Sequence, residues 1–305
     1  MARATLLSPS RYLRSGFGQA LPDGFTLSQL RTTLARAQSQ VDRYCNVPKQ
    51  PTPFNWRGGT MTDEQHQWKI INPLAYGPGA RRVYLNCGPV KTVTDFHLDL
   101  GKTYMVAINP ANDIYINKME QYVELVAINP TIAGFYPLAV NLGLYNPLAR
   151  ISYTYGWTFP VSGDVLEAES PSQFSATYGN WDAAIPPVVY LNNVIESSAN
   201  YAVDYDDGTI TFSSANEPTV SETVTCDYTY LAPDPVVQAI GITATSLIGL
   251  SRMAQRGMTG LQSIRVAEVA LTALQPSQLV TKNGASIPAE AASLLDGGYI
   301  FGSAF

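Results

Sequence analysis

The side chains that most often carry catalysis are few in this chain and poorly spaced for it. The two histidines, His66 and His97, lie in no His-Glu-x-x-His pattern and near no cysteine pair, so the spacing typical of zinc enzymes is missing. The nearest approach to a Gly-x-Ser-x-Gly motif is Gly249-Leu250-Ser251, which falls inside a predicted helix where the sharp nucleophile turn cannot form. The sequence therefore predicts no catalytic residue, no cofactor and no enzyme activity.

Three aspartates, Asp204, Asp206 and Asp207, are spaced so that their oxygens suit a calcium ion. The glutamate that completes an EF-hand loop is absent. A hairpin turn at Asp207-Gly208 explains the same acids without any ion, because Asp-Gly favours a turn with positive φ. We predict no metal site, and calcium binding stays open as the alternative.

Two further stretches suggest other ligands. Residues 77–82 are rich in glycine and arginine, but they lack the Lys-Ser/Thr ending and the following helix of a phosphate loop. Trp157, Phe159, Tyr178 and Trp181 surround a β-rich segment and could line a sugar-binding surface. Packing within a small β module explains these aromatic residues more simply.

The three cysteines, Cys45, Cys87 and Cys226, are widely separated and form no C-x-x-C motif. An odd number cannot pair completely, so buried free thiols in a reducing compartment are expected.

The composition indicates a subunit that hides much of its surface. Charged residues make up 14% of the 305 residues, against about 25% in typical soluble domains. The net charge of −5, without a basic run, argues against a surface that binds nucleic acid phosphates. A surface of this charge suits a protein wall along which DNA slides without binding.

The element that organises the chain is a long helix predicted at residues 234–256. Asp234 and Pro235 suit its first positions and Gly257 its end. No charged side chain occurs between Asp234 and Arg252, so the helix must be buried on every side. Its polar residues argue against a membrane span. The subunit-interface residues that we predict on this helix are Val237, Ile240, Ala244, Leu247, Ile248 and Met253.

An earlier helix is predicted to begin after Thr26 and to end near Asn46. Thr26 and Gln29 have the spacing of a capping box, and Phe25 with Leu30 supplies a hydrophobic staple. Before it, glycines and Pro22 interrupt any helix, so residues 1–24 are expected to form a flexible arm that orders on a partner.

The remaining segments predict an α+β fold with a helical core, a β-rich middle and an inserted β module. The strand expected at 223–230 precedes the long helix, and a short final helix is expected at 289–295. The predicted organisation is an N-terminal arm at 1–24, a helical core from 25–50 and 227–298, a β-rich region at 51–158, an inserted β module at 159–226 and a C-terminal docking tail at 299–305.

Several segments occur in an order that is familiar from one protein family. A capped helix ends in Val-Asp-Arg-Tyr-Cys (41–45), and a strand set follows that includes Arg-Val-Tyr-Leu (82–85). Tyr-Thr-Tyr (228–230) then leads into the long helix, and Ile-Pro-Ala-Glu-Ala-Ala-Ser-Leu-Leu (287–295) comes near the end. This order resembles the head-to-tail adaptor, or connector, proteins of tailed bacteriophages, although the segment 159–226 is an addition to their pattern.

The resemblance implies a virion structural protein that is assembled in the host cytoplasm. Its copies would form a ring, expected to be twelve-fold, between the portal protein and the tail or neck proteins. Genomic DNA would pass through the channel without sequence-specific binding. By the same resemblance, the portal-docking residues would be Tyr299, Ile300, Phe301 and Phe305.

Two other hypotheses about the function stay open. The chain could be a different neck, tail or capsid-surface protein of a phage. It could also be a carbohydrate-binding or hydrolytic protein that uses the module at 159–226.

Overall fold

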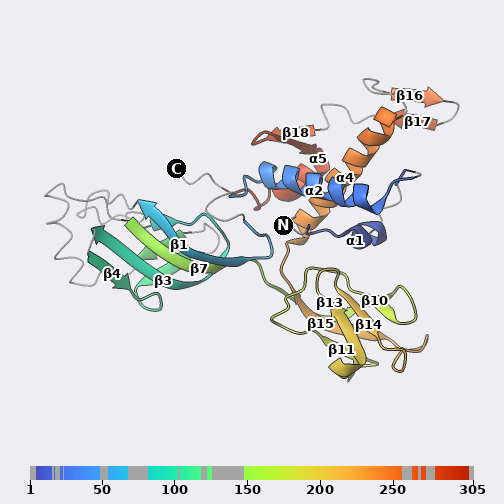
Figure 1. The fold of residues 1–305 in the computed structure, drawn as a ribbon, viewed down its shortest axis with the longest axis horizontal. Coiled ribbons are helices and arrows are strands. Elements are labelled where there is room, and N and C mark those ends of the chain that lie inside the picture. Colours follow the sequence, from blue (N-terminus) through green and yellow to red (C-terminus); the bar gives the residue numbers. More distant parts are fainter. Residues whose placement is uncertain are drawn as a thin grey trace. The chain divides into compact units, whose positions relative to one another are not determined.

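The protein divides into two compact units (Figure 1). The first combines Met1–Val47 with Thr158–Gly302, and the second is formed from Pro48–Trp157. The computed structural model describes residues 5–15, 17, 21–22, 24–48, 54–67, 82–101, 104–117, 122–125, 148–255, 263–266, 269–272 and 279–301.

Antiparallel β-strands make up most of the regular structure, so the predicted α+β class with a helical core is wrong. Many strands are only two to four residues long, which is too short to show alternation in the sequence. Pairing with neighbours orders such strands, and sequence patterns therefore undercount them. The helices among the described residues are α1 (Pro9–Arg14), α2 (Leu27–Tyr44), α4 (Asp234–Gln255) and α5 (Ala289–Leu295).

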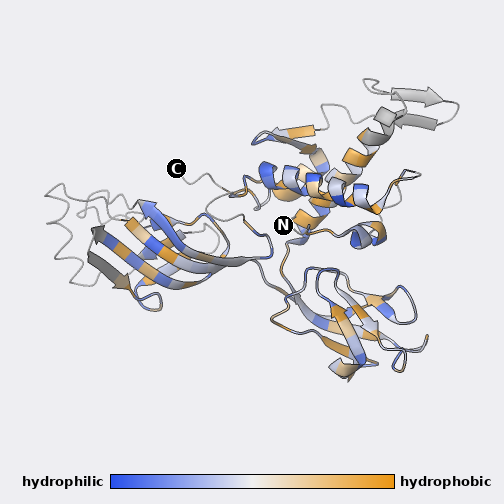
Figure 2. Ribbon diagram, viewed as in Figure 1, coloured by the Kyte–Doolittle hydropathy of each residue, from blue (hydrophilic) through white to orange (hydrophobic). Residues whose placement is uncertain are grey.

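Helix α2 has the N-terminus that the sequence predicts. The Thr26 hydroxyl accepts a hydrogen bond from the Gln29 backbone N–H at 3.2 Å, and Gln29 Oε1 accepts one from the Thr26 N–H at 2.8 Å. Leu30, Leu34 and Val41 lie on its buried side. Figure 2 shows the result: α2 carries many hydrophilic residues, whereas α4 is mostly hydrophobic.

Helix α4 packs against both α2 and α5, and the hairpin of β18 (Leu279–Lys282) and β19 (Ala285–Pro288) contacts all three helices. Asn283 and Gly284 form the turn of this hairpin, with φ of 51° and 72°, as is typical of Asn-Gly. Strand β16 (Ser263–Val266) pairs with β17 (Val269–Thr272) in a second hairpin. No helix in the described part of the chain is both long and apolar enough to cross a membrane.

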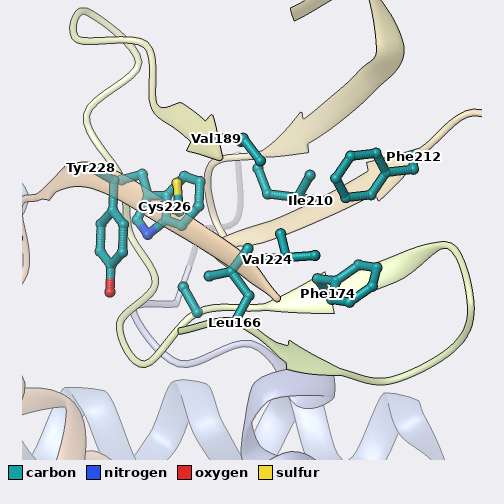
Figure 3. Close-up of a cluster of buried hydrophobic side chains, with 10 residues drawn as sticks. Leu166, Phe174, Val189, Ile210, Phe212, Val224, Cys226 and Tyr228 are labelled. Carbon is teal, nitrogen blue, oxygen red and sulfur yellow. The ribbon is translucent and has the colours of Figure 1, made fainter. Parts of the chain in front are cut away.

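The module at 159–226 consists of two four-stranded antiparallel sheets. Their inner faces share one hydrophobic core that includes Phe174, Val189, Ile210 and Cys226 (Figure 3). The predicted hairpin is confirmed by the pairing of β13 (Tyr201–Asp204) with β14 (Thr209–Phe212). The first sheet has the order β13 (Tyr201–Asp204), β14 (Thr209–Phe212), β10 (Gln173–Ser175) and β9 (Glu167–Ala168), and the second has the order β12 (Val194–Ile195), β11 (Val188–Leu191), β15 (Val224–Tyr230) and β8 (Phe159–Val165).

The second unit is also antiparallel. Strand β7 (Leu148–Tyr155) alternates strictly between buried and half-buried residues, as expected for a sheet with one face on a core. An aromatic cluster of Phe54, Trp56, Tyr155 and Trp157 packs beside it. One sheet has the order β1 (Gly59–Gln67), β7 (Leu148–Tyr155), β3 (Val90–Gly101) and β4 (Tyr104–Ile108), and the other has the order β2 (Arg82–Tyr84), β6 (Tyr122–Leu125) and β5 (Ile114–Asn117).

Candidate interaction surfaces

The predicted interface residues of α4 are mostly used inside the chain. Ile240, Ala244 and Ile248 are at most 1% exposed, and α4 meets α2 and α5 of its own unit. Val237 and Leu247 are half-buried, and the side chain of Met253 lies outside the described residues. Helix α4, whose middle carries no charge, is thus covered first by neighbours from the same chain, and only its less buried positions are available to another subunit.

The N-terminal segment differs from the flexible arm that the sequence predicts. Leu6, Leu7 and Tyr12 are buried, and the Tyr12 hydroxyl shares a hydrogen bond with Thr245 of α4 at 2.8 Å. Gly241 makes room for this packing, because a Cβ atom there would come within 2.6 Å of the Phe17 ring. The apolar residues between the arginines hold the segment against its own chain.

The predicted portal-docking residues have different environments. The Phe301 side chain is 5% exposed, and its N–H donates to the Cys45 carbonyl at 2.8 Å. Asn46 Nδ2 donates to the Phe301 carbonyl at 3.2 Å. Tyr299 and Ile300 are half-buried, and Phe305 lies outside the described residues. Phe301 therefore anchors the C-terminal segment to the end of α2.

Helix α1 connects the N-terminal segment to the inserted module. Arg11 donates to the carbonyl of Asp207 at 2.9 Å and also to that of Thr177, and burial lowers the pKa of its guanidinium. Arg14 pairs with Glu169. These contacts place two cations of α1 on a module that has none of its own.

The three aspartates of the hairpin are explained by the turn and by α1. Asp204 Oδ1 accepts from the backbone N–H groups of Asp206 and Asp207 at 3.0 and 3.1 Å. The Asp207 carboxylate accepts from the Ser10 hydroxyl and lies 3.7 Å from Arg14. Among the residues that the structure describes, no group of His, Cys, Asp and Glu is arranged to hold a metal ion.

The aromatic residues considered for sugar binding do not form one surface. Tyr178 stacks on Tyr230, as Phe159 does, and Trp181 stacks on Tyr228. Trp157 packs with Phe54 and Trp56 in the second unit. The glycine-rich residues 77–81 lie outside the described residues.

The outward side of the β12-β11-β15-β8 sheet is unusually apolar for an exposed surface. Its register aligns Ile195, Tyr190, Thr225 and Val165 in one row across the four strands. Ile195 is 67% exposed and Val165 is 64% exposed. We call Val165, Val188, Tyr190 and Ile195 the module face.

Asp227 lies on the same side as the module face and is held in place. Its carboxylate accepts from the Tyr190 hydroxyl at 3.0 Å and from the Gly163 N–H at 2.7 Å. The bond to Asp227 raises the pKa of Tyr190. A fixed negative charge therefore lies beside an exposed apolar row.

The uniformly negative charge of the module is visible in the sequence, although the predictions above did not use it. The segment 159–226 has ten acidic residues and no Lys, Arg or His. Since the whole chain has a net charge of −5, the other residues together are positive. Repulsion between like charges makes such a module a poor partner for its own copy and a good one for a basic surface. The acids are Asp164, Glu167, Glu169, Asp182, Glu196, Asp204, Asp206, Asp207, Glu217 and Glu222.

Helix α2 has the opposite character. Arg31, Arg36 and Arg43 are exposed on it, as is Leu27 at 58%. Within the described part of the chain, neither Arg31 nor Arg36 forms a salt bridge, and Arg43 reaches only the Gly284 carbonyl at 3.5 Å. An α-helix turns by about 100° per residue, so Arg36 and Arg43 share one side of α2, whereas Leu27 lies on the opposite side from Arg36. We call Arg36 and Arg43 the α2 face.

The second unit contains a cluster of buried titratable groups instead. Glu64 is 2% exposed, and its carboxylate accepts from the Tyr153 hydroxyl at 2.6 Å and from the Asn86 N–H at 2.9 Å. His66 also contacts it. Burial, followed by the nearby Glu64 carboxylate, raises the pKa of Tyr153. Every group here has a partner inside the unit, so the cluster is structural.

All three cysteines are buried and free, as predicted. Burial raises the pKa of Cys45, Cys87 and Cys226 to about 12. Thiols with such a pKa stay protonated near neutral pH and are weak nucleophiles.

Comparison of the sequence with protein families and with curated proteins finds no family model and no curated relative that matches this chain.

Proposed function

We propose that this chain is a virion structural protein of a tailed bacteriophage, a head-to-tail adaptor whose copies form a ring between the portal and the tail or neck. DNA passes through the ring, and the chain contributes binding surfaces to the assembly. The proposal starts from the order of sequence segments that resembles adaptor proteins.

The observation that carries the proposal is how three of those segments meet. The helix at 27–44, the helix at 234–255 and the Ile-Pro-Ala-Glu segment at 287–295 are far apart in the sequence, yet α2, α4 and α5 with β19 pack against one another. Strand β15, with its Tyr-Thr-Tyr end, leads through Pro233 directly into α4. Three of the segments that suggested the family thus form one cluster, and the extra module leads through β15 into α4.

Exposed apolar surface supports an assembled state. Leu27, Val165, Val194 and Ile195 are each more than half exposed. Val165 and Ile195 lie in one row across a sheet, and exposed apolar patches on a folded chain mark sites of protein association.

The test is a mass measurement of the purified chain, first alone and then mixed with the portal protein of the same virus. We expect the mixture to contain portal rings that carry a fixed number of copies of this chain, twelve by the resemblance. A single subunit in both samples, together with its absence from purified virions, would overturn the proposal. Averaged images of virions separate the adaptor position from other neck or tail positions by symmetry.

The C-terminal residues are proposed to dock into the portal from the Phe301 anchor. Truncation after Gly302 removes Phe305 and keeps the hydrogen bonds of Phe301 to Cys45 and Asn46. We expect the truncated chain to melt at the same temperature as the full chain and to lose portal binding. Unchanged binding would contradict the docking role.

A further inference from the structure

We propose that residues 5–15, together with Phe17, form a strap that fastens the inserted module to the helical cluster of α2, α4 and α5. The strap binds as a tethered peptide ligand, and it can leave its site while the module and the helical cluster stay folded. Its binding site is formed jointly by α2, α4 and the module. The proposal does not depend on a ring, because every contact that carries it lies within one copy of the chain.

The module is joined to the rest of the chain at one place. Its first strand, β8, begins at Phe159, and its last strand, β15, ends at Tyr230. These two residues are paired across the sheet, and their rings stack with 4.8 Å between the centroids. Two chain connections that emerge side by side act as a pivot. Among the described residues, no strand of the module packs more than marginally on α2, α4 or α5.

The backbone of Leu6 bridges the two parts. Its N–H donates to Gln38 Oε1 of α2 at 2.9 Å, and its carbonyl accepts from Asn180 Nδ2 of the module at 3.0 Å. Both bonds are buried, and Gln38 and Asn180 are only 6% and 2% exposed. Hydrogen bonds to the main chain give affinity when a protein binds an extended peptide. The helical cluster and the module therefore bind the same residue of the strap from two sides.

Apolar side chains of the strap strengthen this attachment. Leu6, Leu7 and Tyr12 are at most 3% exposed, and the Tyr12 hydroxyl shares a hydrogen bond with Thr245 of α4. The Phe17 ring stacks on that of Tyr12, with 5.9 Å between the centroids. Burial of apolar area is the main favourable term in most protein association, so these residues supply what a peptide ligand needs.

The module adds a slot that fits an arginine. The Arg11 guanidinium donates to the Asp207 carbonyl at 2.9 Å and also to the Thr177 carbonyl. Gly179 leaves room for it, because a Cβ atom at that position would come within 2.7 Å of Arg11 Nη1. The slot thus recognises a cation of the strap on a module that has only acidic charges.

The two parts have contacts that hold them together without the strap. The buried core of the module is formed entirely by residues between Leu166 and Tyr228, and none of them belongs to the strap. Helix α4 packs directly on α2 and α5. The strap is therefore a link between two folded parts, and its release should free the module to turn about its pivot.

The first test releases the strap from the folded, full-length chain. A protease site inserted after Gly18 is cut once the protein has folded, and gel filtration then removes the freed segment. Fluorescence anisotropy measures how a labelled synthetic peptide of residues 1–18 binds to the cut chain. An Arg11→Ala peptide lacks the bonds to the module. A Leu13→Ala peptide is the matched control, because Leu13 lies on the same helix and is 41% exposed.

We expect the cut chain to bind the original peptide, and the Arg11→Ala peptide to bind at least about tenfold more weakly, because its charge-assisted hydrogen bonds are lost. The Leu13→Ala peptide should bind within about twofold of the original. Amides of β11 and β14 should stay protected against hydrogen exchange after the segment has left. Loss of that protection would overturn the inference, as would a segment that neither leaves nor exchanges with the peptide.

The second test keeps the chain intact and measures how firmly the module is held. Spin labels at Ala35→Cys on α2 and Ser214→Cys on the module report the distribution of distances between the two parts. Both positions are exposed, whereas the three native cysteines are buried and should react slowly. Substitution of both Arg11 and Arg14 by alanine should broaden the distribution, and Leu13→Ala should leave it unchanged. A distribution that is equally narrow with and without the arginines would overturn the inference.

Discussion

The two units of the protein treat charge in opposite ways. In the second unit, acids and cations meet within the unit: Asp63 pairs with Arg150 and Glu124 with Arg82. In the first unit the signs are separated, with acids on the inserted module and arginines on α1 and α2. The two signs meet at α1 and, later in the sequence of the helical cluster, in the pair of Lys282 with Asp296 at 3.4 Å.

This difference indicates which charged residues contribute to folding stability and which are available to bind a partner. Buried or paired charges contribute to folding, and removing one partner leaves the other without compensation. Unpaired charges of one sign add little to folding and remain available for a partner. Substitutions in the second unit should therefore change stability, and those on the module and α2 faces should change assembly.

The largest expected loss follows from removing the buried carboxylate of the second unit. Glu64→Ala leaves the Tyr153 hydroxyl and the Asn86 N–H without their acceptor, and we expect a loss of about 2–6 kcal/mol in unfolding free energy, since each buried polar group left unsatisfied costs about 1–3 kcal/mol. Hydrogen exchange of β7 amides measures this unit by itself. Glu64→Gln keeps the shape and one acceptor oxygen and should cost less. A loss below about 1 kcal/mol in Glu64→Ala would show that the cluster is not structural.

Glu64 also shows where sequence reasoning fails. A strand with strict alternation would place Met61 and Glu64 on opposite sides, yet both are 2% exposed. The register shifts between these residues, and Asp63 adopts a φ of 55°, so an extra residue turns Glu64 inward. Non-glycine residues with positive φ are uncommon, and nothing in the local pattern indicated one here.

Other features were readable because they depend on local chemistry. The capping box of α2, the Asp207-Gly208 turn and the span of α4 follow from neighbouring residues alone. The short helix α1 was missed because its order comes from contacts with α4 and the module. The charge of the module was visible in the sequence, but the row of the module face required the strand register.

The next largest effect is expected where the two signs of charge meet in the first unit. Arg11→Ala removes hydrogen bonds to the Asp207 and Thr177 carbonyls, and we expect a loss of about 1–3 kcal/mol. Urea unfolding followed by the fluorescence of buried Trp181 reports on it. Arg14→Ala is the control: its salt bridge to Glu169 joins side chains that are each 24% exposed, so it should cost less than about 1 kcal/mol. Equal losses of stability in Arg11→Ala and Arg14→Ala would contradict the distinction between a buried and an exposed contact of α1.

A smaller effect is expected from pH in the second unit. Hydrogen bonding to Arg150 holds the pKa of Asp63 below its ordinary value. A lowered pKa in the folded state means that the stability is present above the unfolded pKa of about 3.9 and is lost as pH falls through the folded value. The loss should be small, because the Asp63 side chain is 40% exposed. Between pH 5 and pH 3, the protection of β1 amides against hydrogen exchange should fall more in the original chain than in Asp63→Asn. An equal fall of protection in both proteins would contradict this assignment.

The smallest effect gives the sharpest contrast, because the same substitution should have opposite signs in the two units. Glu217→Gln removes an exposed charge from a module whose other charges are also negative, so stability should stay constant or rise, within about 0.5 kcal/mol. Glu124→Gln instead removes the partner of Arg82 and should lower the stability of the second unit. Urea unfolding measures the first change and hydrogen exchange of β6 the second. If both substitutions destabilise, the negative charges of the module are compensated within the chain, and the reason to expect a basic partner for it disappears.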